Sequence, residues 1–575
     1  MTPVTFNGLF GFVHEAPGDC AVIMCGAVGY EQLCASRSWR ELAENIAARG
    51  YPVLRFDWSG CGDSLGDDRD PARLSAWRES LTHATTYVRI NFSPRRIVLI
   101  GLRFGATLAT QHATEAGGVD GLALLGPAIN GRIYGRELAA LAGVVGKPAD
   151  TKAAPALPTD GIEVAGFAIT SETLKAMKSI DLRQLARMPA AHVLLVTLPG
   201  QSGAHEVAVQ LESLGSSVER VDFEGYAELL AEPTYSRTPH TVFDQLMEWL
   251  AATFPSIAKG AIDVSTQHSQ LQGDGFSETP VLFGETRKLF GMFCQPRETS
   301  SESVVIFVNA GANPHIGWAR MNVEFARCLA RSGCASLRID VAGLGDSPPA
   351  PGRDPQIMYD TAPQSDVSAA IDWLQSQGMQ KFTVVGLCSG AHLAFHSAVA
   401  DARINGVVMA NLQRFVWRKD YSLAIALRRG YRSTDFYKGK MMRRDTWKRV
   451  LRGQIDVLGI AAELVRRVHR VAKARIQSVM RGAKKSDDDT AKVRRWFEAL
   501  GKRNTRVLLV YSAEDCGVDE IALHMGPQGK FLKRIQGMEI TLIEAADHNF
   551  TPRWARERLL QLLADFLDPK IKPTS

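Results

Sequence analysis

Several common features are missing from this sequence, and each absence narrows its class. No run of about 18 or more apolar residues occurs, so no transmembrane helix is expected. The N-terminus lacks a basic stretch followed by an apolar one, which argues against a signal peptide. The nine cysteines are odd in number and irregularly spaced, which favours free thiols in a reducing compartment. No spacing of cysteine and histidine indicates zinc, so we expect neither a metal nor a cofactor.

The composition is that of a soluble globular protein, and a length of 575 residues argues for more than one domain. Apolar residues make up 45% of the chain and charged residues 22%, which is enough apolar material for a core in each domain. We expect a cytoplasmic protein. Association with the inner face of a membrane is an alternative that depends on a basic segment described below.

The two halves of the sequence carry the same signals in the same order. Residues 51–64 correspond to residues 334–347, and each segment is an apolar run followed by the pattern D-x-x-G-x-G-D-S. Short apolar runs alternate with amphipathic stretches such as 39–49 and 322–331. Runs that are apolar throughout are typical of parallel strands that helices cover on both faces. The repeat predicts two doubly wound α/β domains in tandem, each with a mostly parallel sheet.

The limits of these domains follow from the repeat and from local composition. The first domain is expected over residues 1–258 and the second over 278–575. A segment rich in Ser, Gln and Gly, 259–277, is the predicted linker. A long basic insertion at about 414–503 is predicted to form a helical cap on the second domain.

The most informative segment is 386–390, which reads Gly-Leu-Cys-Ser-Gly between an apolar run and a helical stretch. The glycines allow a sharp bend between strand and helix, which would lift Cys388 beside a helix N-terminus. The positive end of that helix favours a thiolate. A free cysteine is otherwise a small buried core residue, and the surrounding residues must decide between these interpretations.

The order of strand, D-x-x-G-x-G-D-S block, elbow, late acid and later histidine resembles the α/β-hydrolase superfamily over nearly the whole chain. More narrowly, the Gly-Leu-Cys elbow at Cys388 and the Gly-Leu-Arg elbow at Arg103 resemble two hydrolase-like families associated with exosortase A and exopolysaccharide gene clusters in bacteria. This resemblance implies a role in exopolysaccharide metabolism. Cysteine elbows in the superfamily occur in dienelactone hydrolase-like enzymes and in acyl-CoA:amino acid acyltransferases. Membership of a fold does not by itself define a reaction.

The resemblance also implies the partners of Cys388, because the chain order in this fold is nucleophile, acid, histidine. Asp515 follows the apolar run 507–510 at the family's spacing and is the expected acid, with Glu514 as the alternative. His548 stands just before the final helical stretch and is the expected base. Without these roles, Asp515 would be a solvated loop carboxylate and His548 a structural histidine.

An oxyanion needs two backbone N–H donors near the nucleophile. One is expected from Ser389, which directly follows the apex of the elbow. The other is expected from the loop after the first central strand of the second domain, where Ala310 and Gly311 are the candidates. Ser389 is also a weaker alternative for the nucleophile itself, because its side chain is expected to point toward the helix.

The first half has lost these residues. Arg103 occupies the apex of its elbow, cannot act as a nucleophile and stays charged. Alignment of the two halves places Gln201 opposite Asp515 and Glu228 opposite His548. We therefore predict a degenerate domain without catalytic activity. Arg103 either binds an anion at the helix N-terminus or pairs internally with Glu228.

The basic insertion suggests a partner of opposite charge. Residues 414–503 contain 26 Lys and Arg against 9 Asp and Glu, a net charge of +17 in a chain whose total is +6. The segment could lie on an anionic membrane surface. It could receive coenzyme A, an acyl carrier protein or an acidic sugar chain, or it could be a solvated helical lid. No nucleic-acid-binding motif is present, and we expect no nucleic acid partner.

Two functional hypotheses follow. In the first, the second domain is an esterase, thioesterase or acyltransferase that forms a thioacyl intermediate on Cys388. Its substrate is an ester or thioester, linked to coenzyme A or to a carrier protein in one version. In the second, the protein is a non-catalytic binding or scaffold protein in which Cys388 is the remnant of a degraded elbow. Hydrolysis and transfer remain equal alternatives within the first hypothesis.

Overall fold

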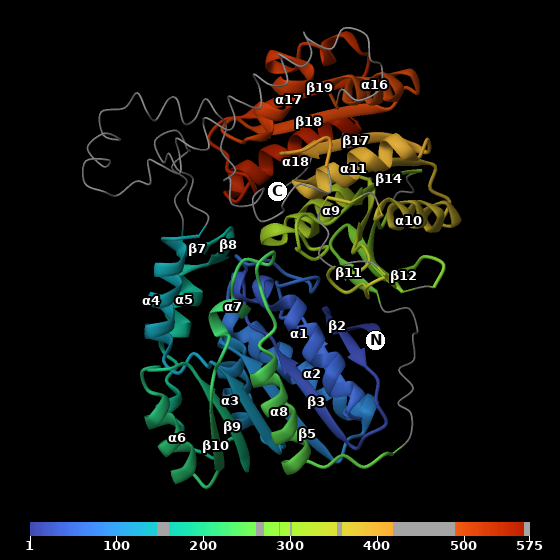
Figure 1. Cartoon of the computed structure of the whole chain (residues 1–575). Coiled ribbons are helices and arrows are strands. Elements are labelled where there is room, and N and C mark those ends of the chain that lie inside the picture. The colour runs from blue at the N-terminus through green and yellow to red at the C-terminus, as the bar shows by residue number, and fades with distance from the viewer. Residues whose placement is uncertain are drawn as a thin grey trace, which may run out of the picture.

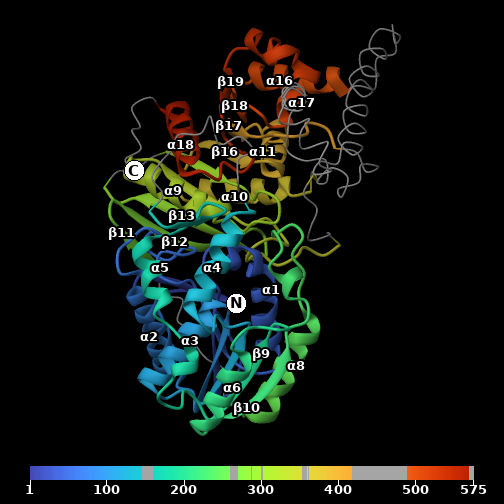
Figure 2. The ribbon, with the colours of Figure 1, turned by 90° about the vertical axis from the view of Figure 1, so that its left-hand side faces the viewer.

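The structure is a computed structural model, which describes residues 1–145, 160–259, 270–286, 288–298, 302–352, 359–360, 362–417 and 489–568. These residues form two α/β domains, coloured blue to green and yellow-green to red in Figure 1. The second domain stacks on the first in this view and also after a quarter turn (Figure 2). The predicted fold class, two tandem doubly wound domains, is confirmed. Within the described residues, no helix has both the length and the apolar character needed to cross a bilayer.

The first domain is built on an eight-stranded sheet in the order β1-β2-β4-β3-β5-β6-β9-β10. The β1–β2 and β2–β4 pairs are antiparallel and the remaining pairs are parallel. All six residues of β3 are buried, as expected for a central strand covered on both faces. The strands are β1 (Thr2–Phe6), β2 (Leu9–His14), β3 (Cys20–Cys25), β4 (Val53–Phe56), β5 (Arg96–Leu102), β6 (Gly121–Leu125), β9 (His192–Thr197) and β10 (Ser217–Asp222).

Helices cover both faces of this sheet. Side chains of α2 and α3 pack in one apolar cluster, and those of α1 and α8 pack in another. Helix α1 begins at Tyr30, earlier than the amphipathic stretch 39–49 alone predicts. These helices are α1 (Tyr30–Ala48), α2 (Arg73–Phe92), α3 (Phe104–Ala116) and α8 (His240–Thr253), and the shorter helices are η1 (Leu182–Gln184), α6 (Ala204–Ser213) and α7 (Tyr226–Leu229).

A cap-like segment that sequence analysis did not single out connects β6 to β9. It contains α4 (Gly131–Ala142), the antiparallel hairpin of β7 (Ile162–Val164) and β8 (Phe167–Ile169), and α5 (Ser171–Lys178). The hairpin lies beside the second domain in Figure 1. Its Gly166 carbonyl accepts a bond from Arg556 of the second domain at 3.4 Å.

The second sheet has nine strands in the order β11-β12-β13-β15-β14-β16-β17-β18-β19. The pairs from β11 to β15 are antiparallel, and those from β15 to β19 are parallel. Without β11, the order repeats that of the first sheet strand for strand. The strands are β11 (Leu271–Gly273), β12 (Phe276–Phe283), β13 (Leu289–Pro296), β14 (Ser303–Phe307), β15 (Ala335–Ile339), β16 (Lys381–Leu387), β17 (Ile404–Ala410), β18 (Arg506–Ser512) and β19 (Met538–Ile543).

The helices of the second domain also fall into two layers. Side chains of α9 and α18 share one apolar cluster, while those of α10, α11 and α16 share another. The helix predicted over 322–331 is α9 almost to the residue. The elements are η2 (Trp318–Arg320), α9 (Met321–Arg331), α10 (Gln364–Ser376), α11 (Ser389–Ala400), α16 (Asp489–Lys502), α17 (Gly517–Met525), η3 (Pro527–Gly529), η4 (Leu532–Arg534) and α18 (Arg553–Leu567).

The segment 259–277 is not linker throughout. Strand β11 and the first residues of β12 pair as a hairpin and extend the second sheet. Gly275 has a φ of 72° in the turn between them, a value that favours glycine. The polar, glycine-rich composition at this end of the segment therefore reflects a tight turn. Residues 260–269 lie outside the described part of the chain.

Most of the predicted basic cap, 418–488, lies outside the described residues. The two ends of the predicted insertion belong to the domain core. Phe497 of α16 is fully buried and its ring centroid lies 5.0 Å from that of Phe395. At the other end, Arg414 pairs with the buried Glu520 at 2.7 Å. Both ends of the predicted insertion, near 414 and near 503, therefore pack into the core of the second domain.

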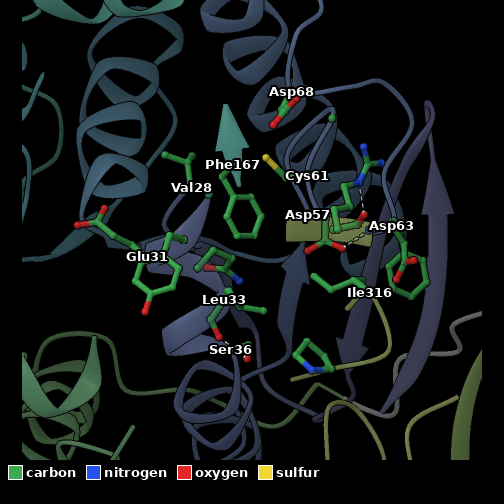
Figure 3. A pocket seen from close by; sticks show the side chains of 18 of the residues that line it. Val28, Glu31, Leu33, Ser36, Asp57, Cys61, Asp63, Asp68, Phe167 and Ile316 are labelled. Carbon is green, nitrogen blue, oxygen red and sulfur yellow. Dashed lines mark hydrogen bonds between the residues drawn. The ribbon is translucent and has the colours of Figure 1, made fainter. Parts of the chain in front are cut away.

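A cavity of about 100 Å³ lies where the domains meet. Residues from the strand ends of the first domain, from the β7–β8 hairpin and from a second-domain loop line it. Figure 3 shows Val28, Asp57, Phe167 and Ile316 around this space. The cavity is apart from the Cys388 elbow, which is not among its lining residues.

Candidate active site

The elbow of the second domain places Cys388 between the end of β16 and the start of α11. Its backbone is strained, with φ 56° and ψ −116°. The flanking glycines leave no room for side chains, because a Cβ atom at Gly386 would lie 2.1 Å from the Gly390 carbonyl oxygen. A Cβ atom at Gly390 would lie 2.3 Å from the carbonyl oxygen of Asn309. The local sequence thus produces the sharp strand-to-helix turn predicted for a nucleophile elbow.

The predicted acid and base meet at the carboxyl end of the second sheet. Asp515 Oδ2 lies 2.6 Å from His548 Nδ1, and the other Asp515 oxygen accepts the N–H of Gly517 at 2.7 Å. Burial lowers the pKa of His548, but the Asp515 carboxylate and the Cys388 sulfur outweigh this effect and hold the pKa well above its usual range. The structure therefore brings Cys388, Asp515 and His548 into one interacting group.

Asn411 braces the loop that carries the histidine. It directly follows β17, and its Nδ2 donates to the His548 carbonyl at 2.7 Å and to Ser512 Oγ at 2.9 Å. Its Oδ1 accepts the Ser512 N–H at 2.7 Å, and Ser512 Oγ donates to the carbonyl of Asp547. Sequence analysis missed Asn411. Its position at the carboxyl end of a parallel strand, beside the predicted elbow strand, is the signal that could have found it.

A tyrosine stands beside the thiol. The Tyr359 hydroxyl lies 3.9 Å from Cys388 Sγ, and its ring stacks on Trp417 with the centroids 4.7 Å apart. Burial raises the pKa of Tyr359 well above its usual range, so the hydroxyl keeps its proton and can donate it in a hydrogen bond. The sequence around Tyr359 has no pattern that predicts this contact.

The residues predicted for the oxyanion site lie together beside the elbow. The Gly311 N–H donates to Ser389 Oγ at 2.8 Å. The Ser389 side chain was expected to point toward the helix, but its hydroxyl reaches the loop after β14. The N–H of Ser389 is the first of α11, and the first N–H groups of a helix have no partner within the helix. Ala310 lies in the same loop and, like Cys388, packs against the apolar cluster that α9 and α18 share.

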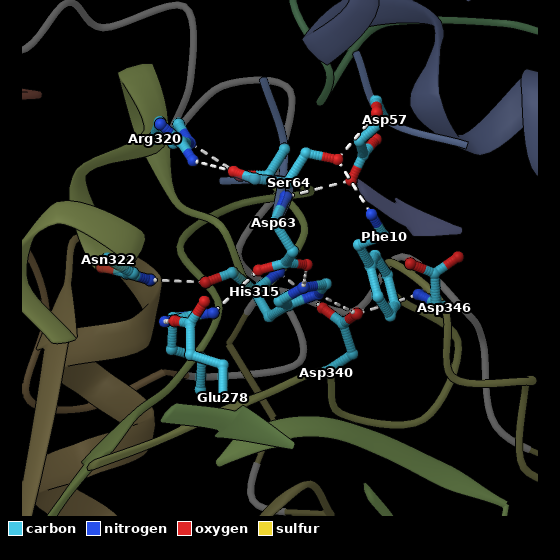
Figure 4. Close-up of polar contacts among 12 residues, drawn as sticks. Phe10, Asp57, Asp63, Ser64, Glu278, His315, Arg320, Asn322, Asp340 and Asp346 are labelled. Atoms are coloured by element: carbon cyan, nitrogen blue, oxygen red, sulfur yellow. Dashed lines mark hydrogen bonds and ion pairs between the residues drawn. The ribbon is translucent and has the colours of Figure 1, made fainter. Parts of the chain in front are cut away.

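Buried charges anchor residues 309–315, the loop that carries the candidate oxyanion donors (the oxyanion loop). Asn309 Nδ2 and the His315 N–H both donate to Asp340 Oδ1 at 2.7 Å, which ties the two ends of the loop to one carboxylate. His315 then joins two carboxylates through its ring, with Nδ1 2.7 Å from Asp340 Oδ2 and Nε2 2.6 Å from Asp63 Oδ2. Asp63 belongs to the first domain, so the interface reaches the oxyanion loop directly (Figure 4).

The charges of this network are mutually stabilised. Burial lowers the pKa of His315, but Asp63 and Asp340 outweigh it and raise the pKa well above its usual range. Burial likewise raises the pKa of Asp63, but His315 and Arg338 outweigh it and bring the pKa far below its usual range. Arg338 contacts Asp63 at 2.8 Å and Glu278 at 2.7 Å. His315 is therefore an imidazolium held between carboxylates.

The interface has an approximate twofold character. Arg338 of the second domain pairs with Asp63, and the equivalent Arg55 of the first domain pairs with Asp346 at 2.6 Å. In each domain the serine of the D-x-x-G-x-G-D-S block accepts a backbone N–H through its Oγ, that of Phe10 at 2.9 Å and that of Phe290 at 2.8 Å. The duplicated blocks thus meet face to face, as identical surfaces do in a symmetric dimer.

One group among the described residues has the spacing of a metal site. His315, Asp340 and Asp346 each offer a ligand atom, and these atoms lie within 4.8 Å of one another. Both ring nitrogens of His315 are already bonded to carboxylates, and Asp346 pairs with Arg55. Because these side chains already form ion pairs at the domain interface, we interpret the cluster as part of that interface.

The degenerate elbow of the first domain is closed by ion pairs. Arg103 Nε lies 2.8 Å from Glu31, a second guanidinium nitrogen lies 2.6 Å from Glu137, and a third donates to the Gly126 carbonyl at 3.0 Å. The alternative of internal pairing is thus the one observed, but the expected partner was wrong. Glu228 lies on the short helix α7 and is exposed.

Gln201 is equally remote from a catalytic role. Its side chain accepts the Leu198 N–H at 3.1 Å and donates to the Pro127 carbonyl at 2.7 Å. These bonds join the loop after β9 to the loop after β6. Arg103, Gln201 and Glu228 therefore do not form one site. The partners Glu31 and Glu137 lie on α1 and α4, and no local pattern links them to Arg103.

Comparison with known protein families finds a match in each domain. A family model described as serine aminopeptidase, S33 matches residues 34–195, and one described as alpha/beta hydrolase family matches residues 305–556. Together with the repeated strand order, these matches agree with two α/β-hydrolase folds in tandem. Each domain matches a different model, in keeping with the divergence of the two elbows.

Solved structures with similar folds include Est1E from Butyrivibrio proteoclasticus with bound ferulic acid, at 14% identity and a TM-score of 0.33 over 44% of this chain and 99% of that one. Another is the Pyrococcus furiosus esterase Pf2001, at 17% identity and 0.30 over 44% and 91%. A third is proline iminopeptidase from Mycobacterium smegmatis, at 12% identity and 0.30 over 44% and 97%. None of the curated protein sequences matches the chain.

Proposed function

We propose that the second domain is a hydrolase or acyltransferase that acts on an ester or thioester through a thioacyl intermediate on Cys388. The observation that carries this proposal is the contact of Asp515 with His548 at 2.6 Å, next to a cysteine at the apex of a strained elbow. A carboxylate on Nδ1 leaves Nε2 as the nitrogen that can exchange a proton with the thiol. The same carboxylate stabilises the imidazolium that forms.

The steps follow the usual order for an activated thiol. His548 takes the proton of Cys388, and the thiolate attacks the carbonyl carbon of the substrate. His548 then returns the proton to the leaving alcohol or thiol, and the acyl group stays on sulfur. Water, activated by His548, or an acceptor hydroxyl or amine releases it in the second half of the reaction.

The tetrahedral intermediate needs donors on its oxygen. We propose the N–H groups of Ser389 and Ala310. The Gly311 N–H donates to Ser389 Oγ, which makes Gly311 the weaker of the two loop candidates. The Tyr359 hydroxyl, 3.9 Å from the sulfur, can in addition donate to the thiolate.

We also propose that the acyl donor is linked to coenzyme A or to a carrier protein and that the basic segment attracts it, or attracts an anionic membrane surface. Residues 418–488 of that segment lie outside the described part of the chain, so this proposal rests on charge alone. A role in exopolysaccharide metabolism in the cytoplasm is proposed from the resemblance of the two elbows. Loss of polysaccharide export on deletion of the gene would support it, and unchanged export would contradict it.

The mechanism is tested by trapping the intermediate. The full chain is mixed with p-nitrophenyl butyrate or butyryl-coenzyme A, quenched in acid and examined by peptide mass spectrometry. We expect a butyryl group on the peptide that contains Cys388, and loss of turnover by at least about 1,000-fold in Cys388→Ala.

The matched control is Cys328→Ala, which removes a half-buried thiol on α9. It should leave turnover unchanged. Turnover of Cys388→Ala equal to that of the unaltered chain would overturn the proposal. A protein that folds but neither labels nor turns over any ester or thioester would favour the scaffold alternative.

A further inference from the structure

The cavity at the domain junction has the composition of a small-molecule site. Its walls are mostly apolar and carry several aromatic rings, and the second domain closes one side with Ile316. Pockets that bind small molecules are typically apolar with a few polar groups, and they favour domain junctions. The main apolar lining residues are Phe10, Phe12, Tyr30, Trp77, Leu138 and Phe167.

Acidic groups outnumber available basic groups around this cavity. Of the acids that line it, Asp63 and Asp346 are committed to interface pairs, and Glu31 is committed to Arg103. Three more acids line the cavity, namely Asp57, Asp68 and Glu324. Asp57 and Asp68 each accept one backbone N–H, from Asp63 at 3.0 Å and from Ala168 at 2.7 Å. Glu324 lies 3.8 Å from Arg556 Nε.

The arginines of the cavity are occupied elsewhere. All three guanidinium nitrogens of Arg320 donate to backbone carbonyls, those of Gly62, Ser64 and Gly66, at 2.5 to 2.7 Å. Arg73 donates to the carbonyl of Asp67 and to the sulfur of Cys61. Arg55, the third arginine that lines the cavity, pairs with Asp346 at 2.6 Å. An anionic ligand would therefore meet several carboxyl groups and only arginines that already have partners.

Two of the remaining acids, Asp57 and Glu324, have raised pKa values. Burial, with Asp63 nearby, raises the pKa of Asp57 to about 7. Burial also raises the pKa of Glu324 to about 7, although Arg556 opposes the shift. A carboxyl group whose ionisation is suppressed by burial favours a ligand that brings a positive charge next to it.

We propose that this cavity binds a small organic cation, an amine or similar group on an apolar body. The ammonium group would pair with Glu324 and Asp68, and the apolar body would lie against the aromatic walls, whose faces also attract cations. Figure 3 shows Asp68 and Phe167 on the borders of the same space. The proposal is independent of the chemistry at Cys388, which is in another part of the molecule.

The test compares three ligands of equal length on the full chain: hexylamine, hexan-1-ol and hexanoate. Binding is measured by calorimetry and by the shift in melting temperature. We expect hexylamine to bind with one-to-one stoichiometry, at least about tenfold more tightly than hexan-1-ol, because a buried charge pair contributes this much or more. Hexanoate is expected not to bind. Hexanoate that binds as tightly as hexylamine, or hexylamine that fails to bind at all, would overturn the proposal.

Variants locate the ligand. Glu324→Gln and Asp68→Asn keep the size of the side chain, and Asn can still accept the Ala168 N–H. Each should weaken the binding of hexylamine by about tenfold or more and should leave the binding of hexan-1-ol unchanged. Glu115→Gln, on the exposed face of α3, is the matched control and should change neither.

A steric variant separates the cavity from the surface. Ala168→Leu places a larger side chain in the lining of the cavity, and it should weaken the binding of hexylamine and of hexan-1-ol to a similar extent. Equal hexylamine affinity in all of these variants would exclude the cavity as the site. Because Cys388→Ala should bind hexylamine normally, failure of the catalytic proposal would leave this test intact.

Discussion

The two elbows of this protein share one backbone and differ in chemistry. Arg103 has φ 54° and ψ −120°, while Cys388 has 56° and −116°. The N–H of each residue donates to the end of the neighbouring strand at 2.9 Å, to Leu125 and to Ala410 respectively. The strained turn has therefore been kept where no nucleophile remains. Close packing of the flanking glycines explains this, since Gly101 and Gly386 both lie against the following helix.

The two elbows differ in the partners of the residue at the apex. Arg103 is enclosed by Glu31 and Glu137 and lies over the rings of Tyr134 and Tyr226. Cys388 is half-buried and faces a histidine with its own carboxylate. The first site holds an arginine paired with two carboxylates, and the second holds a carboxylate–histidine pair beside a thiol. The same fold thus supports two elbows with different side-chain chemistry.

The largest effect that separates the two sites is expected at His548. His548→Gln should lower kcat/KM for a model ester at least about 1,000-fold, because the variant loses the group proposed to take the thiol proton. Asp515→Asn should lower it by about 100-fold or more, since the histidine loses its orienting carboxylate. The equivalent positions in the first domain provide the controls. Gln201→Ala and Glu228→Ala should leave the same rate within twofold, and a comparable loss in either would show that the first domain is catalytic.

The next effect compares the two halves of the interface. Asp63 is buried and has two cationic partners, so Asp63→Asn should lower the free energy of unfolding by about 3–5 kcal/mol. The equivalent Asp346 is 12% exposed and pairs with Arg55, so Asp346→Asn should cost about 1 kcal/mol. Urea denaturation of the full chain measures both.

Turnover sharpens this comparison. Asp63 holds His315 and through it the oxyanion loop, so Asp63→Asn should lower kcat more than it raises KM, at a temperature where the variant is folded. Asp346→Asn should leave kcat unchanged. Equal effects of the two variants on kcat would mean that the interface does not position the loop.

A smaller effect is expected from pH. The pKa of His315 is raised in the folded state, so its contribution to stability is complete below about pH 6.5 and is lost as the pH rises through the folded value. His315→Gln removes this contribution. The gap in unfolding free energy between the unaltered chain and His315→Gln should therefore be widest at pH 6 and should narrow toward pH 10. His205→Gln, exposed on α6, should show no such gap, and a His315→Gln gap that does not change with pH would contradict the assigned charge.

How far the sequence predicts this molecule depends on whether a feature is local. The sheets and both elbows follow from apolar runs and glycines that constrain their own neighbours, and these predictions agree with the structure. The meeting of Cys388, Asp515 and His548 also follows, because the fold brings the carboxyl ends of its parallel strands to one edge. Asn411 and Tyr359 could not be found in this way, since each contacts the site from a loop without a pattern. The partners of Arg103 could not be found either, because they come from helices 72 and 34 residues away in the chain.

The smallest effect on turnover is expected from restoring sulfur to the first elbow. Arg103→Cys alone would leave Glu31 buried without its cation, so the variant is best combined with Glu31→Gln, which can still accept the Tyr134 hydroxyl. In a Cys388→Ala background, this first-domain pair of changes should give no detectable ester turnover. The backbone of the first elbow already has the required bend, so we would attribute the lack of turnover to the missing acid and base. Detectable acyl transfer would show that the elbow is sufficient without them. The matched double variant in the unaltered second domain should keep full turnover, which checks that the first domain still folds and supports the oxyanion loop.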